Sequence, residues 1–351
     1  MPAEHTGGAS SGETVSWRRM AIGALEFVLA SDGRFDIGKP NTVFVALDNL
    51  PFDDLAASAD EVEVHQNALL IQSGEQWIVF ETGLSSLKKG PSTGRLVENM
   101  AHAGIDPGAV SAIVPTHAHL DHIGGVMADG DTRNFPNAQI YLQLRELDFW
   151  LSDDRMGTSV EGSALAARMN LIPNLDRIVF HDDSKEILPG VHTMHTPGHT
   201  VGHTSFLISS GRDTLCVVGD IVHNNLQIER PTVSVQFDTD PAQAVTTRYE
   251  FLSSWPQIIS LLCSIICPGR GLVISTKPRM VFASYPCLAR RAKTELSSRV
   301  ERRRSSSLHI LAGLAYASSF PDRNLVSRFH LDCIETLRHE SGRRSTQLVH
   351  S

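Results

Sequence analysis

Short apolar runs bounded by turn residues dominate the first part of the chain and predict β-strands. Residues 25–30 and 35–37 flank Ser31-Asp32-Gly33, and an Asp-Gly pair between apolar runs is a strong hairpin signal. A second pair of β-rich runs, residues 67–72 and 76–81, flanks a turn that contains a glycine. We therefore expect two β-hairpins in the first 81 residues.

Helical spacing first occurs at residues 95–103, and Gly104 follows as the expected C-cap. Residues 111–115 are apolar and end in a proline, which cannot continue a central strand, so they predict a short buried strand. The last helix is expected to begin at Pro241, with Asp240 as its N-cap. Between these segments we expect strands at residues 139–142, 191–195, 204–209 and 214–219, and helices at residues 144–151 and 164–171.

The strand that ends at Pro115 leads directly into Thr116-His117-Ala118-His119-Leu120-Asp121-His122, which holds three imidazoles and a carboxylate within six positions. Histidines are ordinarily scattered along a chain and solvated, so this density indicates a metal site. Zinc binds neutral imidazole nitrogen and carboxylate oxygen, and catalytic zinc sites keep one position open for water. The same ligand types also suit iron or manganese, so they do not by themselves select zinc.

His117-x-His119-x-Asp121-His122, followed by Gly124-Gly125, resembles the signature of the metallo-β-lactamase-fold hydrolases. Two later segments match the same family in order, Thr-Pro-Gly-His-Thr at residues 196–200 and Val-Val-Gly-Asp at residues 217–220. The resemblance implies two metal ions. Their ligands would be His117, His119 and His199 for the first ion, and Asp121, His122 and a bridging Asp220 for the second.

The resemblance runs from about Leu25 to about Phe251. Residues 146–150 and 234–241 look like the branch of the family that contains organophosphate hydrolases and lactonases. The family usually has an aspartate at the position of Glu81. That aspartate would steady the metal-binding loops, so the longer side chain of Glu81 is a departure from the family pattern.

The fold that the resemblance implies is α/β (α+β), a four-layer αβ/βα sandwich with two mixed sheets face to face and helices outside. Its metal loops would lie along one edge, with the His117 and His199 side chains within about 8 Å of each other. We expect a disordered leader over residues 1–19, because the first 13 residues are small and polar. The hydrolase domain is expected over residues 20–255, and an atypical basic, Ser/Arg-rich tail over residues 256–351.

Charge and cysteine content narrow the function class. The net charge is −8; residues 255–351 contain 15 Lys+Arg against 6 Asp+Glu, which leaves −17 for residues 1–254. This acidic part argues against nucleic acid as a substrate. Four of the five cysteines lie in the basic end and imply no disulfide framework, so a cytoplasmic location is expected. No window approaches the roughly 18 apolar residues of a membrane span.

The family pattern is lost after about residue 255. The family would place one more strand and a final metal-binding histidine there, yet residues 260–285 contain no histidine, and the next are His309 and His330. One interpretation is a basic appendage that binds an acidic partner or is phosphorylated. The other is a segment without selected structure, from a shifted reading frame or an intron. We favour the second, because the pattern is lost abruptly inside an expected strand.

The resemblance implies a hydrolase that uses a zinc-bound hydroxide to cleave a lactone, ester, thioester or phosphotriester in a small molecule. Asp121 and His122 are the expected catalytic residues, with Asp121 orienting the hydroxide. Up to two zinc ions are expected per chain, the second bound weakly because the last histidine is missing. The alternative is a metal-impaired or inactive homologue with a binding or regulatory role. A serine nucleophile is poorly supported, because the G-x-S-x-G match at residues 8–12 follows no strand.

Four other histidines lie near the later motifs: His192, His195, His203 and His223. A hydrogen-bonded or surface histidine is the favoured interpretation for each. His223 is the best candidate for a pocket residue because it follows Asp220 by three positions. Phe149 and Trp150 are interpreted as core packing rather than substrate contacts. The expected partner is a small-molecule substrate, with no nucleic acid and no membrane; a homodimer is left open.

Overall fold

The computed structural model describes residues 17–48, 61–84, 93–128, 131–183, 185–211 and 213–254, together with the backbone of residues 5–6, 273–274 and 280–282. The chain divides into two compact units, residues 1–289 and 290–351, and every described residue lies in the first. The predicted tail therefore lies outside the described residues, except for the backbone of two short strands.

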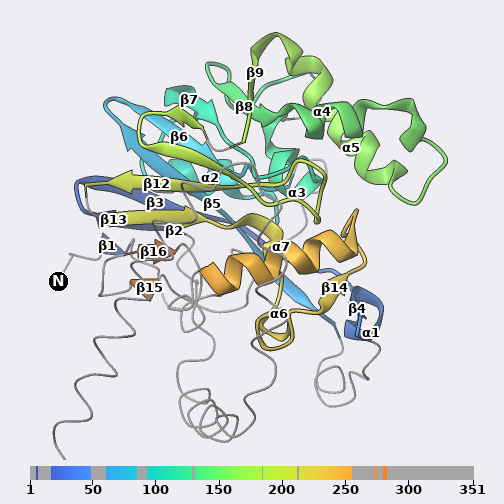
Figure 1. Ribbon diagram of the computed structural model, residues 1–351. Coiled ribbons are helices and arrows are strands. Elements are labelled where there is room, and N and C mark those ends of the chain that lie inside the picture. Colours follow the sequence, from blue (N-terminus) through green and yellow to red (C-terminus); the bar gives the residue numbers. More distant parts are fainter. Residues whose placement is uncertain are drawn as a thin grey trace, which may run out of the picture. The chain divides into compact units, whose positions relative to one another are not determined.

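The first sheet has eight strands in the order β1-β2-β3-β5-β6-β7-β8-β9 (Figure 1). The pairs from β1 to β6 are antiparallel, and the pairs from β6 to β9 are parallel. β2 begins at Trp17, three residues before the predicted start of the hydrolase domain. The strands are β1 (His5–Thr6), β2 (Trp17–Ile22), β3 (Leu25–Asp36), β5 (Glu63–Ser73), β6 (Gln76–Phe80), β7 (Val110–Ile113), β8 (Gln139–Gln143) and β9 (Ile178–His181).

The second sheet has six strands in the order β10-β11-β12-β13-β16-β15. Its strands are β10 (Glu186–Leu188), β11 (Val191–His195), β12 (Thr204–Ser210), β13 (Asp213–Val217), β15 (Val273–Ile274) and β16 (Met280–Phe282). β16 pairs with β13 in parallel, so it extends this sheet. A separate two-stranded ribbon joins β4 (Phe44–Ala46) to β14 (Val233–Val235).

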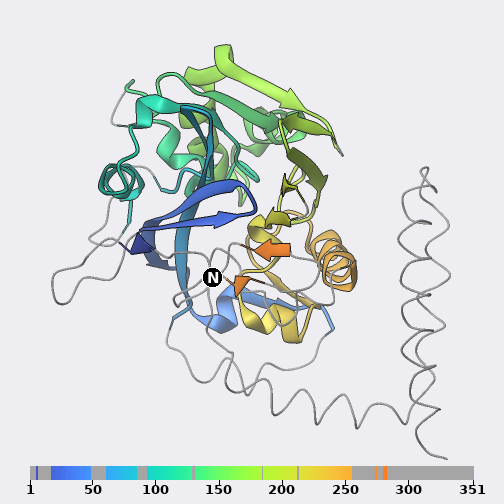
Figure 2. The ribbon, with the colours of Figure 1, turned by 90° about the vertical axis from the view of Figure 1, so that its left-hand side faces the viewer.

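The longer helices pack on the outer faces of the two sheets, and two short ones, at residues 40–43 and 225–229, pack against the two-stranded ribbon. The α-helices are α1 (Pro40–Val43), α2 (Leu96–His102), α3 (Leu120–Ile123), α4 (Leu144–Leu151), α5 (Glu161–Leu171), α6 (Asn225–Glu229) and α7 (Pro241–Ser254). Short 3-10 turns are η3 (Pro107–Ala109), η4 (Gly124–Val126), η5 (Asp153–Arg155), η6 (Ile172–Arg177) and η7 (Gly219–Ile221). Figure 2 shows α7, in orange, beside the yellow strands of the second sheet.

Alternating side chains of the strands build the layers. In β5, Leu69 packs between the two sheets with Phe206 of β12, whereas the next residue, Leu70, packs on the helix side with Met100 of α2. The outer face of the second sheet packs through Cys216 against α7. Helix, sheet, sheet and helix therefore follow one another, and the predicted four-layer αβ/βα sandwich is confirmed.

The first predicted hairpin is wrong. Residues 25–36 form one continuous strand, β3, and its turn to β2 lies earlier, at Gly23-Ala24, where Gly23 has φ of 57°. A register shift between Ser31 and Gly33 absorbs the residues that were expected to turn. The Asp-Gly pair predicted the wrong structure because the Asp32 side chain accepts hydrogen bonds from distant segments of the chain and does not close a local turn.

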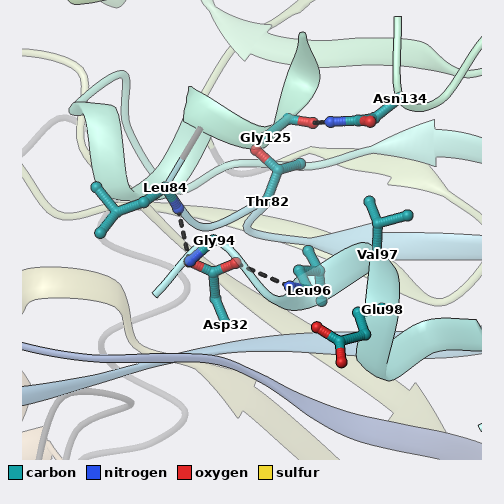
Figure 3. Close-up of a pocket in the computed structure, with 9 residues that line it drawn as sticks. All are labelled: Asp32, Thr82, Leu84, Gly94, Leu96, Val97, Glu98, Gly125 and Asn134. Carbon is teal, nitrogen blue, oxygen red and sulfur yellow. Dashed lines mark hydrogen bonds between the residues drawn. The ribbon is translucent and has the colours of Figure 1, made fainter. Parts of the chain in front are cut away.

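The Asp32 carboxylate accepts hydrogen bonds from the backbone N–H groups of Leu84 at 2.8 Å, Gly94 at 3.2 Å and Leu96 at 3.0 Å. The side chain is buried on the wall of a cavity of about 310 Å³ (Figure 3). Asp32 thus ties β3 to both flanks of residues 85–93 and to the start of α2.

The other predicted elements are confirmed. β5 and β6 pair around Gly74, α2 is followed by Gly104 with φ of 75°, and α7 begins at Pro241. Asp240 Oδ1 accepts a hydrogen bond from the backbone of Gln243 at 2.9 Å, as expected of an N-cap.

Cys216, in the described part of β13, is buried and free. Within that part of the chain, no helix combines the length and the apolar character that crossing a bilayer would need.

Candidate metal centre

Three loops bring the predicted ligands together. His117 and His119 follow β7, and His119 precedes α3, which carries Asp121 and His122. His199 lies in the turn after β11, and Asp220 lies in η7, directly after β13. Each loop leaves the carboxyl end of a strand, so a shared edge of the sandwich holds all six side chains.

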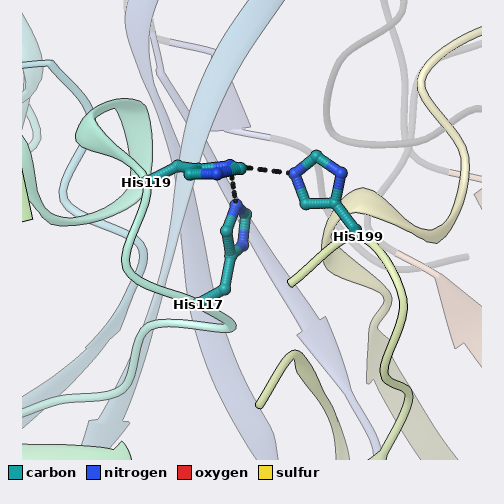
Figure 4. A group of neighbouring side chains, drawn as sticks. All are labelled: His117, His119 and His199. Carbon is teal, nitrogen blue, oxygen red and sulfur yellow. Dashed lines mark hydrogen bonds between the residues drawn. The ribbon is translucent and has the colours of Figure 1, made fainter. Parts of the chain in front are cut away.

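Three imidazoles converge on one point (Figure 4). His119 Nδ1 lies 2.9 Å from His117 Nε2 and 3.0 Å from His199 Nε2. The ring centroids of His117 and His199 are 4.7 Å apart, which is within the predicted 8 Å. The spacing of the three nitrogens suits ligands that share one ion.

A second group forms around the Asp220 carboxylate. Asp220 Oδ2 lies 3.3 Å from His199 Nε2 and 3.4 Å from His122 Nε2. Asp121 Oδ2 lies 3.4 Å from the same nitrogen of His122. Asp220 therefore lies between the first imidazole group and the Asp121-His122 pair, where a bridging ligand would be.

Two atoms of this group are buried without a hydrogen-bond partner, His122 Nε2 and Asp220 Oδ1. A buried polar atom without a partner is destabilising, and such atoms in native proteins often face an ion or a water molecule. The donor set of neutral imidazoles and carboxylates is the one that divalent metals such as zinc prefer. The residues present therefore fit a divalent metal ion.

The outer nitrogens of three of these imidazoles are held in place. His117 Nδ1 contacts Thr116 Oγ1 at 3.0 Å, and His199 Nδ1 contacts Asp238 Oδ1 at 2.8 Å. His122 Nδ1 lies 2.9 Å from Glu81 Oε2. The carboxylates of Glu81 and Asp238 only accept, so they place a ring proton on the outer nitrogen of His122 and His199 and turn the inner nitrogen toward the centre. Thr116 restrains the ring of His117.

Glu81 makes two contacts with the metal loops, despite its departure from the family pattern. Oε1 accepts a hydrogen bond from the backbone of Thr116 at 3.2 Å, while Oε2 contacts His122. Glu81 has φ of 65°, and the other residues with positive φ in the described chain are glycines. The left-handed backbone aims the longer side chain at both loops.

Two motif glycines allow backbone segments to approach closely. A Cβ at Gly219, which has φ of 63°, would lie 2.5 Å from His203 Nε2 and 2.8 Å from Thr116 Oγ1. A Cβ at Gly125 would lie 2.0 Å from the carbonyl oxygen of Thr82. The glycine that precedes Asp220 is therefore needed to bring that aspartate against the first metal loop.

Burial controls the charges of the centre. It lowers the pKa of His117 well below the ordinary value and, with His199 nearby, lowers the pKa of His119 to about 3. Burial alone would raise the pKa of Asp220, but the nearby His122 and His223 hold it well below its usual range. Burial alone would also lower the pKa of His122 and His199, but Asp220 beside His122 and Asp238 beside His199 hold both above the ordinary value. At neutral pH His117 and His119 therefore present neutral imidazole lone pairs, and the bridging carboxylate is ionised.

Glu146 is a buried carboxylate that links the two histidine loops, a role that the sequence did not reveal. Its Oε2 accepts hydrogen bonds from the backbone of Ala118 at 3.0 Å and from Trp150 Nε1 at 2.8 Å. Its Oε1 accepts one from the backbone of Gly202 at 2.7 Å. Trp150 is fully buried in the core, and its ring also lies 5.2 Å from that of His119.

Glu146→Gln is expected to lower the free energy of unfolding by about 1–3 kcal/mol. Both oxygens of Glu146 accept from N–H groups, so the NH2 group of the glutamine would face a donor and leave it without an acceptor. The substitution is also expected to weaken metal binding about tenfold, since the loops of His119 and His199 lose a shared anchor. Denaturant unfolding with and without zinc measures both effects. Glu75→Gln, in the exposed β5–β6 turn, is the matched control. Unchanged zinc affinity in a destabilised Glu146 variant would limit Glu146 to a structural role.

Of the four other histidines, His192 is exposed on β11, and His195 contacts Asp183 and Arg145. His203 is buried and fully bonded, since Thr196 contacts its Nδ1 at 2.9 Å and Nε2 accepts from the backbone of Asp220 at 3.0 Å. His223 is buried beside Asp220, where the sequence placed a pocket residue.

Asp238, which holds His199, had no predicted role, although it lies in a segment that looks like the lactonase branch. Its carboxylate also accepts hydrogen bonds from Ser234 Oγ at 2.5 Å and from the backbone of Val235 at 3.2 Å. The β4–β14 ribbon thus positions the partner of a predicted metal ligand.

The sequence pattern of the metallo-beta-lactamase superfamily matches residues 62–269. The chain belongs to this superfamily and is a hydrolase of the metallo-β-lactamase fold.

Among curated proteins, the chain is similar to an N-acyl homoserine lactonase of a Bacillus species, with 27% identity over 235 residues, 64% of this chain and 85% of that protein. It is also similar to an N-acyl homoserine lactonase of Bacillus cereus, with 28% identity over 159 residues. That match covers 44% of this chain and 56% of the relative, so it spans about half the relative's length.

Two solved structures share the fold. One is AidC, a dizinc quorum-quenching lactonase in complex with a product, with a TM-score of 0.66 and 23% identity over 78% of this chain and 98% of AidC. The other is the hydrolase AbOPH, with a TM-score of 0.65 and 23% identity over 79% of this chain and 99% of AbOPH. The two structures show the shared fold, and the lactonase relatives agree with the organophosphate hydrolase and lactonase branch that the motifs predicted.

Proposed function

We propose that this chain is a metal-dependent lactonase, with N-acyl homoserine lactones as its substrate class. The observation that carries the proposal is the convergence of the six predicted ligand side chains. Five of them form groups that could hold a metal ion, and Asp121 lies beside His122. Two of the six have buried atoms without a partner. The substrate class is supported by the lactonase relatives, whose similarity extends over most of the hydrolase domain.

His117, His119 and His199 would hold one ion, and Asp121, His122 and the bridging Asp220 would hold a second. When bound, such ions lower the pKa of water and polarise a carbonyl oxygen. Zinc is the proposed metal, since imidazole and carboxylate donors suit it and the fold neighbour AidC is a dizinc enzyme.

Asp121 is the proposed proton carrier. Its side chain is 24% exposed, in contrast to the buried His122 beside it, so its carboxylate is open to an arriving substrate. An ionised carboxylate only accepts hydrogen bonds, so Asp121 orients the attacking water toward the carbonyl carbon and takes its proton. His122 Nε2 lies 3.4 Å from Asp121 Oδ2, so both side chains would face the same ion.

The reaction opens the ring without a covalent enzyme intermediate. The water oxygen bonds to the carbonyl carbon, and the bond between that carbon and the ring oxygen breaks. Asp121 returns the proton to the ring oxygen, which leaves as the hydroxyl group of a hydroxy acid. The product is the ring-opened N-acyl homoserine.

A substrate panel tests the proposal. Zinc-loaded protein is mixed with an N-acyl homoserine lactone, a plain lactone, an aryl ester and a phosphotriester, and the products are identified by mass spectrometry. We expect the highest kcat/KM for the acyl homoserine lactone and no turnover after chelation. Rapid phosphotriester hydrolysis without lactone opening would place the chain functionally with the organophosphate hydrolases instead. Absence of all turnover would favour the metal-impaired alternative.

The two ions are expected to bind unequally, because residues 260–285 provide no final histidine. Loss of even an outer contact typically costs about 10- to 100-fold in affinity, and loss of a direct ligand should cost at least as much. Titration of the metal-free protein with zinc should therefore show one tight and one weak equivalent, with turnover rising only as the weak one fills. Two equally tight equivalents would contradict this expectation and would indicate another ligand, such as His309 or His330.

A further inference from the structure

His223 is a buried imidazole for which neither the motifs nor the mechanism provide a role. Its side chain is 4% exposed, and the backbone N–H of His223 donates to Gln227 Oε1 at 2.7 Å, which fixes the residue at the end of its loop. Both ring nitrogens, however, are buried without a partner of hydrogen-bond geometry. A buried ring with two unpartnered nitrogens indicates a missing ligand or ion.

The neighbouring His203 shows what a structural histidine looks like in this region. Both of its ring nitrogens are hydrogen-bonded, one to Thr196 and the other to the backbone of Asp220. His223 lies equally close to Asp220 but has no comparable partners. Burial beside the centre therefore does not by itself explain His223.

The position of His223 Nε2 matches that of a ligand. It lies 3.2 Å from Asp220 Oδ2, and His199 Nε2 lies 3.3 Å from the same oxygen. Two ligands at about 2.1 Å from one zinc, separated by the tetrahedral angle, are about 3.4 Å apart. The donor atoms of His199, Asp220 and His223 all lie within 4.8 Å of one another, so one ion can contact all three.

We propose that His223 is an additional metal ligand, which donates Nε2 to the ion that His199 and Asp220 contact. This inference rests on metal binding in the proposed function but not on the lactone substrate. The outer nitrogens of His117 and His199 are held by Thr116 and Asp238, whereas the outer nitrogen of His223 has no partner. His223 is therefore the less restrained ligand, and an incoming substrate oxygen can displace it more easily.

Zinc affinity tests the proposal directly. Metal-free protein is titrated against a chromophoric chelator in the absence of substrate, and the tight equivalent is compared between variants. We expect His223→Ala to lower the zinc affinity of the tight site about tenfold, because the ligand that is lost has no partner on its outer nitrogen. X-ray absorption at the zinc edge should show one imidazole fewer per tight ion. His192→Ala, an exposed histidine on β11, is the control and should bind zinc like the unmodified chain.

His223→Gln keeps a polar side chain of similar size and is the second variant, in case the alanine variant does not fold. An amide is a poor zinc ligand, so the same loss of affinity is expected. Wild-type affinity and imidazole count in a folded His223 variant would overturn the proposal, even if turnover fell, since His223 would then contact the substrate only. Because no substrate is present, the result does not depend on whether the chain is a lactonase.

Discussion

His199→Ala is expected to abolish turnover and occupancy of the tight metal site. His199 Nε2 lies 3.0 Å from His119 Nδ1 and 3.3 Å from Asp220 Oδ2, so its removal takes away the ligand common to both groups. Outer contacts are typically worth about 10- to 100-fold in metal affinity, so a direct ligand should cost more than about 100-fold. His117→Ala should behave in the same way, because it also removes one of three imidazoles from one ion.

Elemental analysis after dialysis, combined with lactone hydrolysis, measures both consequences. His102→Ala, an exposed histidine in the last turn of α2, serves as the control for loss of an imidazole. Circular dichroism of the metal-free proteins separates loss of metal from loss of fold. Full metal content and turnover in either ligand variant would refute the assignment of these histidines.

Asp220→Asn is expected to weaken both metal equivalents at once. The carboxylate oxygen Oδ2 lies within 3.4 Å of ring nitrogens of His122, His199 and His223, so it serves both groups. The amide has nearly the same shape, but it lacks the charge and presents one oxygen instead of two. Because the charge of a ligand contributes strongly to the affinity of a divalent ion, we expect a loss of at least about 100-fold at each site.

Zinc titration of the Asp220 variant resolves the two equivalents, and turnover is measured on the same samples. Asp36→Asn, at the exposed end of β3, is the control for loss of a carboxylate. A variant that lost one equivalent and kept the other at full affinity would show that Asp220 is a terminal ligand and not a bridge.

The sequence predicted most of the strands and helices, because these depend on local patterns, and its resemblance to a known family implied the sandwich and the residues that converge. Apolar runs, turn glycines and clustered histidines are all read over a few neighbouring residues. The Asp-Gly pair at residues 32–33 failed for the opposite reason. Its meaning depends on contacts with Leu84 and Leu96, more than 50 positions away.

Supporting residues were harder to predict than ligands for the same physical reason. Asp238 and Glu146 are ordinary acidic residues in their own segments, and only the folded chain brings them against His199 and the two histidine loops. In the sequence, His223 differed from His203 only in its position three residues after Asp220. Their difference lies in whether the buried ring nitrogens find partners, which no local pattern shows.

Asp32 also couples parts of the chain that lie far apart in the sequence. Its single carboxylate anchors Leu84 and Gly94, the two flanks of residues 85–93. Just before this segment, the backbone of Thr82 donates to the carbonyl of His122 at 2.8 Å, and the carbonyl of Gly83 accepts from Gly125 at 3.1 Å. Thr82 and Gly83 are therefore tied to the metal loops by backbone hydrogen bonds that do not involve Asp32. Loss of the Asp32 carboxylate should therefore release Leu84, Gly94 and the start of α2 together, while the backbone contacts of Thr82 and Gly83 with the metal loops stay in place.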